Sequence, residues 1–87
     1  MYQCMTERIE RVQTGIRIEK RMLKVLKGLA EHLDISVGEL VECMTLYGFE
    51  GQAPFSQRTL GKIEKLKEVY DLDWTIADAH AHKEDME

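Results

Sequence analysis

The sequence predicts a mainly α-helical protein with one short β-strand, assembled as a dimer through that strand. Apolar residues alternate with polar residues over positions 12–18, then recur every three or four positions in later segments. A lone strand leaves its backbone N–H and C=O groups unpaired, so it must pair with a second copy or lie unpaired in water. Strand-mediated homodimerisation is the leading expectation.

The predicted strand has one apolar face and one polar face. The apolar face consists of Val12, Thr14, Ile16 and Ile18. The opposite face consists of Gln13, Gly15 and Arg17. Because successive side chains of a strand point to opposite faces, we expect the first set to face a core and the second to be exposed.

Three helices are expected after the strand, at residues 19–33, 37–47 and 57–70, with a short final segment at 76–83 capped by Thr75. The second helix has the clearest start signal. Ser36 and Glu39 have the spacing of a capping box, in which each side chain accepts a hydrogen bond from the other residue's backbone amide. Ile35 and Leu40 occupy the positions of a hydrophobic staple around that cap.

Charge is distributed unevenly along the chain. The net charge is -4, yet residues 1–28 contain seven Lys and Arg against three Glu, so the remainder is strongly acidic. An acidic protein as a whole argues against a nucleic-acid partner, whereas a basic first third is compatible with one. The alternative is that these cations only solvate a strand and a helix.

Length and composition describe one small domain of 87 residues. We divide it into an amino-terminal arm (1–11), a central domain (12–49) and a carboxy-terminal helical extension with an acidic tail (50–87). No apolar run is long enough to span a bilayer and no signal peptide is indicated, so a cytoplasmic location is expected. Cys4 and Cys43 lack the spacing of a zinc site or a disulfide framework, and no cofactor is expected.

The order of elements over residues 12–49 resembles the ribbon-helix-helix family of bacterial DNA-binding proteins, the Arc and MetJ class. The similarity rests on three stretches, which are IRI at 16–18, LAEHL at 29–33 and ISVGEL at 35–40. In that family two chains pair their strands into an antiparallel ribbon that enters the major groove of DNA. The resemblance therefore implies a homodimer that binds double-stranded DNA.

The resemblance also implies roles for individual residues. The base-reading positions are Gln13, Gly15 and Arg17. The phosphate-binding positions at the start of the second helix are Ser36, Val37 and Gly38. The expected dimer core comprises Ile16, Ile18, Leu26, Leu29, Leu40 and Met44.

The side-chain chemistry agrees with two of the base-reading positions. Arg17 can donate two hydrogen bonds to guanine, and Gln13 can pair with adenine. Gly15 departs from the polar residue usual in the family, and the Glu39 carboxylate competes with a phosphate for the same helix end. The alternative is that Gln13 and Arg17 are simply the solvated face of a dimerising strand.

These features predict a homodimeric transcriptional repressor that acts on a palindromic operator. The alternative is a protein-interaction module of the same dimeric fold without operator recognition. The extension either covers the helical core or binds a second protein through residues 55–80, as in antitoxins that carry a toxin-neutralising tail.

Enzymatic and metal-binding functions are not expected. The sequence has no nucleophile elbow, phosphate loop or zinc hydrolase motif. Asp78, His80 and His82 form a D-x-H-x-H array, but residues two apart on a helix point away from each other and do not converge on one ion. We therefore expect no metal ion at this array.

Overall fold

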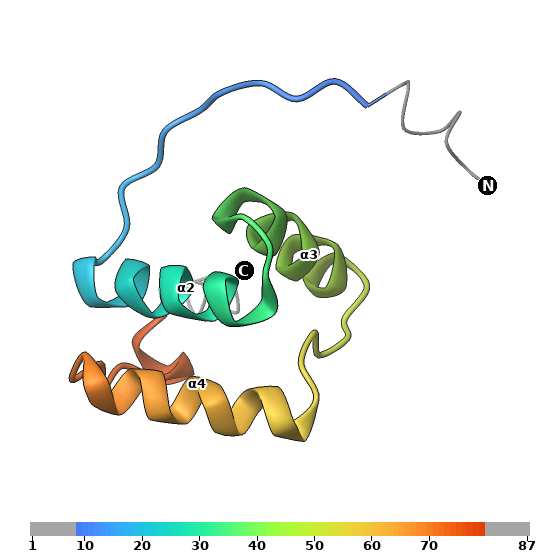
Figure 1. Cartoon of the computed structure of the whole chain (residues 1–87). Helices are drawn as coiled ribbons and strands as arrows, with labels where there is room; N and C mark the ends of the chain where they lie inside the picture. Colours follow the sequence, from blue (N-terminus) through green and yellow to red (C-terminus); the bar gives the residue numbers. More distant parts are fainter. Residues whose placement is uncertain (1–8, 80–87) are drawn as a thin grey trace.

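In the computed structural model, which describes residues 9–79, an extended segment leads into three α-helices (Figure 1). Helix α2 spans Lys20–Leu33, α3 spans Val37–Phe49 and α4 spans Gln57–Val69. A short 3-10 helix, η1, follows at Ile76–Asp78. None of the described helices is both long and apolar enough to cross a membrane.

The predicted strand is absent from the described residues, and the predicted ribbon-helix-helix fold is wrong. Residues 9–18, called the arm below, contain no strand and make no backbone–backbone hydrogen bond to another of the described residues. Val12 and Ile16 are 80% and 73% exposed. The alternating pattern supplies an apolar face, but residues 9–79 contain neither a second strand to pair with the arm nor a core against that face. The arm therefore arches away from the helices (Figure 1).

The three expected helices are confirmed, with ends shifted by one or two residues. Helix α2 begins after Glu19, whose side chain accepts a hydrogen bond from the Met22 amide at 2.9 Å. The capping box at α3 is confirmed, because the Glu39 amide donates to Ser36 Oγ at 3.1 Å and the Ser36 amide donates to Glu39 Oε1 at 2.9 Å. Thr75 caps η1 as expected. Residues 80–83 of the predicted final segment lie outside the described residues.

All three helices end in the same way, with one residue in the left-handed region just after the helix. These residues are Asp34, Gly51 and Asp71, with φ values of 63°, 70° and 56°. In each case the next amide donates back to the last turn, for example Ile35 N to Ala30 O at 3.0 Å. This is the Schellman arrangement, which satisfies carbonyl groups that the helix leaves free.

Helix α2 lies between the other two helices and supplies most of the core. Leu29 and Ala30 of α2 and Leu40 of α3 are buried, and Leu40 is completely inaccessible. Helix α4 runs antiparallel along α2 (Figure 1). A Cβ atom at Gly28 would lie 2.9 Å from Leu66 Cδ2, so the glycine allows the close approach of α4.

Candidate nucleic-acid interface

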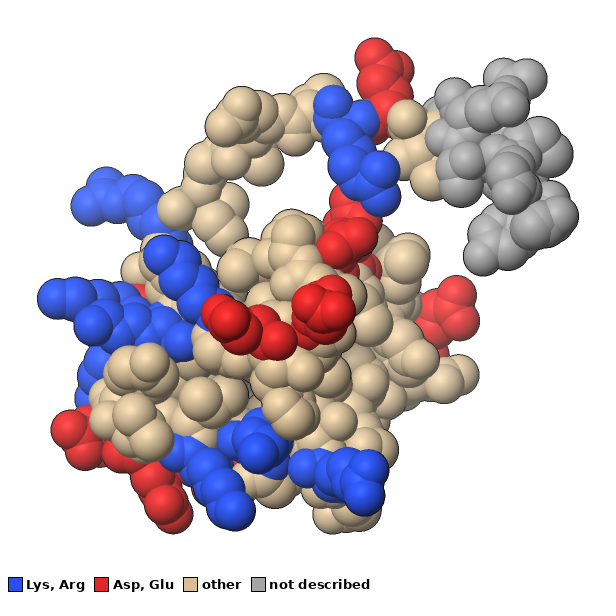
Figure 2. Space-filling view, in the orientation of Figure 1, with Lys and Arg blue, Asp and Glu red and all other residues tan. Residues whose placement is uncertain are grey.

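The predicted base-reading residues lie on the arm and are all exposed. Gln13, Gly15 and Arg17 have little packing around them, and a Cβ atom at Gly15 would meet nothing within 4 Å. The arm is separated from the helices by a visible opening in the space-filling view (Figure 2). Arg17 forms no ion pair with a carboxylate of the described residues. Its guanidinium group is therefore available to a ligand.

A basic face continues from the arm along α2. Lys20, Lys24 and Lys27 follow Arg17 at helical spacing, and all three are exposed. None of them forms an ion pair within residues 9–79, although the Lys24 ammonium lies 5.7 Å from the centre of the Tyr70 ring. Figure 2 shows Lys and Arg side chains gathered at the side of the molecule where α2 begins. We call Arg17, Lys20, Lys24 and Lys27 the basic face.

The predicted phosphate-binding residues lie in a different electrostatic setting. They are Ser36, Val37 and Gly38 at the start of α3, where the Glu39 carboxylate already accepts a hydrogen bond from the Ser36 amide. Ser36 and Gly38 line a shallow depression whose charged residues are Glu10, Arg11, Glu39 and Glu42. Three carboxylates against one arginine disfavour an anion, even though a helix N-terminus attracts one. The geometry therefore supports phosphate binding at the basic face better than at the start of α3.

Arg11 joins the arm to α3. Its Nε and Nη2 atoms donate to the two carboxylate oxygens of Glu42 at 2.9 and 3.1 Å. These hydrogen bonds lower the pKa of the Glu42 carboxyl group and raise the pKa of Arg11. Of the two arginines of the arm, Arg11 is therefore engaged, whereas Arg17 forms no ion pair within the described residues.

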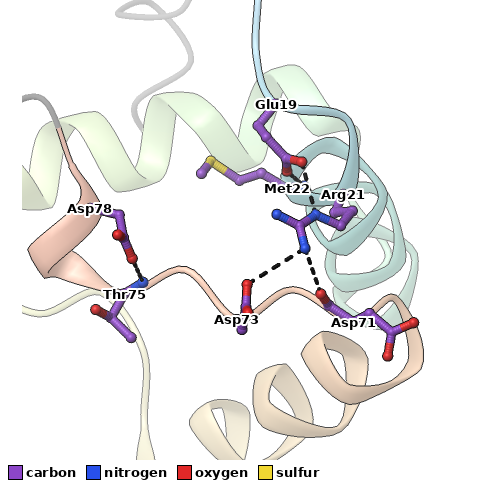
Figure 3. A network of polar contacts seen from close by, with 7 residues as sticks. All are labelled: Glu19, Arg21, Met22, Asp71, Asp73, Thr75 and Asp78. Atoms are coloured by element: carbon purple, nitrogen blue, oxygen red, sulfur yellow. Dashed lines mark hydrogen bonds and ion pairs between the residues drawn. The ribbon is translucent and has the colours of Figure 1, made fainter.

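A second arginine joins the start of α2 to the segment after α4 (Figure 3). Arg21 Nε donates to Glu19 Oε2 at 2.9 Å, and its Nη1 donates to the Asp71 carbonyl at 2.8 Å and lies 3.5 Å from Asp73 Oδ1. The hydrogen bond from Arg21 lowers the pKa of Glu19. The cluster fixes residues 71–73 beside α2, so at this point the extension packs on the helices.

The predicted dimer-core residues divide into two groups. Leu29 and Leu40 are buried within the single chain, and Leu26 and Met44 pack against them. Ile16 is exposed on the arm and Ile18 is partly buried. The first group contributes to the core of one chain, whereas Ile16 has no cover of this kind.

The predictions of site residues did not include three apolar side chains of α3 that are exposed. They are Leu46, Tyr47 and Phe49, and Phe49 is 80% exposed. Leu40 is the only residue of α3 that is fully buried. The sequence signal was available, because VGELVECMTLYGF is apolar almost all round, and such a helix is usually covered on more than one side.

A metal site finds no support in the described part of the chain. Residues 9–79 contain no group of three or more His, Cys, Asp or Glu side chains arranged to hold an ion. Asp78 instead accepts a hydrogen bond from the Thr75 amide at 2.8 Å. His80 and His82, the other members of the D-x-H-x-H array, lie outside the described residues, as does Cys4.

Comparisons with known proteins do not assign the chain to a family. No family model matches it, and neither a curated protein nor a solved structure shows significant similarity.

Proposed function

We propose that this protein binds double-stranded DNA as a homodimer and represses transcription from the site that it occupies. The observation that carries the proposal is the basic face, where Arg17 and three lysines of α2 stand together with no carboxylate partner among residues 9–79, in a chain of net charge -4. Unpaired cations are the groups that phosphates attract, because binding releases the counterions of the DNA. A cytoplasmic location belongs to the same proposal.

Sequence preference would come from the arm. Gln13 and Arg17 are exposed on a segment that is extended and clear of the helices, so they can reach the base edges of a groove. A bidentate arginine contact to guanine contributes about 1–3 kcal/mol of discrimination against other bases. Gly15 adds no side-chain donor but lets the backbone approach the DNA closely.

Self-association would come from the exposed apolar residues of α3. Leu46, Tyr47 and Phe49 are exposed apolar side chains, which are costly to leave in water. A second copy is the occupant that this proposal names. Two copies would also place two basic faces in one assembly, which suits a site with two half-sites.

The test is duplex binding with a matched pair of variants. We expect the protein to bind duplexes selected from a random pool, with an affinity that falls steeply as salt is added. Arg17→Ala should weaken binding to the selected sequence about tenfold or more. Arg58→Ala removes the same charge from an exposed position on α4 and should have a much smaller effect. Failure to bind any duplex at low salt would exclude the proposal.

A second candidate function, a protein-interaction module without operator recognition, is favoured by the amount of exposed apolar surface. Besides the α3 surface, Val69 and Ile76 are exposed in and after α4, within the extension. The same experiment separates the candidates. A chain that associates through these surfaces but binds no duplex would be an interaction module.

A further inference from the structure

Helices α2 and α4 carry matching pairs of lysines around the point where they touch. The helices are antiparallel, and Gly28 of α2 faces Leu66 of α4 at close range. In each helix, lysines stand four residues and one residue before this contact residue, and they are Lys24 and Lys27, called the α2 pair, and Lys62 and Lys65, called the α4 pair. An antiparallel helix pair has a local twofold axis, which relates residues at equal offsets from the contact. The two lysine pairs therefore lie on the same face of the molecule.

The surface that carries the two pairs is positively charged. All four lysines are exposed, and none forms an ion pair with a carboxylate of residues 9–79. Figure 2 shows Lys and Arg side chains over α4 on the face that also presents those of α2. A hollow on this face has one carboxylate against two ammonium groups, and it is lined by Lys24, Lys27, Gly28, Glu31 and Tyr70. The face is therefore suited to a polyanion.

Another side of α4 has the opposite charge. A second hollow there has four carboxylates and one ammonium group in its lining, which consists of Glu64, Lys67, Glu68, Asp71, Leu72 and Asp73. The charges of α4 are thus divided by side. The basic side is the one that continues the surface of α2.

The match between the two helices ends at Lys62. Because the helices are antiparallel, residues earlier in α4 lie beside residues later in α2. Arg58 precedes Leu66 by eight residues and would be level with position 36, whereas α2 ends at Leu33. Arg58 therefore lies beyond α2 and belongs to neither pair.

From this symmetry we propose that the DNA-binding surface extends across α4, with the α2 pair contacting the phosphates of one strand and the α4 pair contacting those of the other. The inference rests on the proposed binding of double-stranded DNA. The strands of a duplex are antiparallel and are related by local twofold axes, so lysine pairs of the same symmetry can make equivalent contacts. Packed helices lie about 8–10 Å apart, which is comparable with grooves about 6–12 Å wide. The carboxy-terminal extension thereby becomes part of the DNA-binding surface.

The experiment measures duplex binding over a range of salt concentrations. The double variant Lys62→Gln with Lys65→Gln should lose two phosphate contacts, which reduces the slope of log K against log salt by about 1.8, or about 0.9 for each contact. Lys24→Gln with Lys27→Gln should lose the same amount. Each double variant should weaken selected and unrelated duplexes by the same factor, because phosphates carry no sequence information.

Lys67→Gln is the matched control. It removes the same charge from the same helix, but from the side whose hollow is acidic. The slope should therefore equal that of the wild type. Glu31→Gln removes the carboxylate from the hollow between the pairs, and should strengthen duplex binding about twofold or more at low salt. Unchanged binding by this variant would mean that the DNA does not cover the hollow, and would overturn the placement.

Single-stranded DNA tests whether the two pairs contact different strands. A single strand of the same sequence cannot occupy both pairs in the proposed way, so loss of the α4 pair should cost less affinity than it does on the duplex. Equal losses on the two substrates would overturn the arrangement across two strands.

Two outcomes separate failure of this inference from failure of the proposed function. If the wild type binds duplexes and the α4 variant has the same slope as Lys67→Gln, the role of α4 is overturned and DNA binding stands. If the wild type binds no duplex at low salt, the proposed function is overturned and the inference with it.

Discussion

Helix α2 buries its apolar residues more completely than the arm and the exposed side of α3 do. Three residues of α2 are buried, Gly28 admits Leu66 at close range, and the Arg21 cluster closes the far end of the pair. The arm and α3 leave Val12, Ile16 and Phe49 in water. Helix α2 is therefore covered within one chain, while the arm and the exposed side of α3 leave apolar side chains in water.

The largest expected effect comes from comparing one substitution in α2 with one at an exposed position of α3. Leu29→Ala opens a cavity in the core and should lower the free energy of unfolding by about 2–5 kcal/mol. Phe49→Ala removes a larger side chain from an exposed position, and should change the stability of the monomer by less than about 0.5 kcal/mol while weakening self-association. Urea unfolding at low protein concentration and sedimentation measure the two quantities. Equal destabilisation by both variants would refute the contrast.

Two glycine substitutions test whether the close packing of α4 on α2 depends on Gly28. Gly61→Ala places a methyl group where nothing lies within 4 Å, so it should stabilise the protein by about 0.5–1 kcal/mol through helix propensity. Gly28→Ala has the same propensity gain, but Leu66 must shift, at a cost of about 1–3 kcal/mol. We expect it to be net destabilising in thermal unfolding. A gain at Gly28 equal to that at Gly61 would show that the helices do not need the glycine.

The helix ends offer a smaller test. Asp34→Gly and Asp71→Gly relieve the strain of left-handed backbone after α2 and after α4, and should each stabilise the protein by up to about 1 kcal/mol. Gly51→Ala imposes the same strain at the end of α3 and should cost about 1 kcal/mol. Chemical denaturation measures all three. Destabilisation by both aspartate variants would mean that their side chains contribute more than the backbone strain costs.

The smallest expected effect is on the pH dependence of stability. Hydrogen bonds from arginine lower the pKa of Glu19 and of Glu42 below the ordinary value of 4.5. The stability that each pair contributes is therefore complete above about pH 4.5 and is lost as the pH falls through the lowered pKa. Glu19→Gln should reduce this loss in acid unfolding more than Glu42→Gln, because Glu19 also caps α2. A larger effect of Glu42→Gln would mean that the Arg11–Glu42 pair contributes more stability than Glu19 does.

The helices could be predicted from the sequence because their signals are local. The Ser36–Glu39 spacing and the apolar periodicity of α2 determine hydrogen bonds and faces within a few residues. The expected strand fails for the opposite reason. Alternation over residues 12–18 says which side chains share a face, but pairing requires a second strand, and no neighbouring sequence supplies one.

The candidate site was predictable only in part. Gln13 and Arg17 are exposed, but Val12 and Ile16, which the alternation placed toward a core, are exposed as well, so their exposure does not depend on the alternation. The Arg11–Glu42 and Arg21–Asp71 contacts join residues 31 and 50 positions apart, a distance over which sequence periodicity carries no information. The exposed apolar residues of α3 could have been found, since the helix carries more apolar residues than one covering neighbour can bury.

The unsupported course of the arm has a practical consequence for how the molecule can be dissected. An extended, exposed backbone is what a protease active site accepts, and Arg17 presents the side chain that trypsin requires. Helical arginines such as Arg58 are held in backbone hydrogen bonds and resist cleavage. Brief digestion should therefore cut the arm first and release the helices as an intact fragment, separating Gln13 and Arg17 from the helical part of the molecule with a single cut.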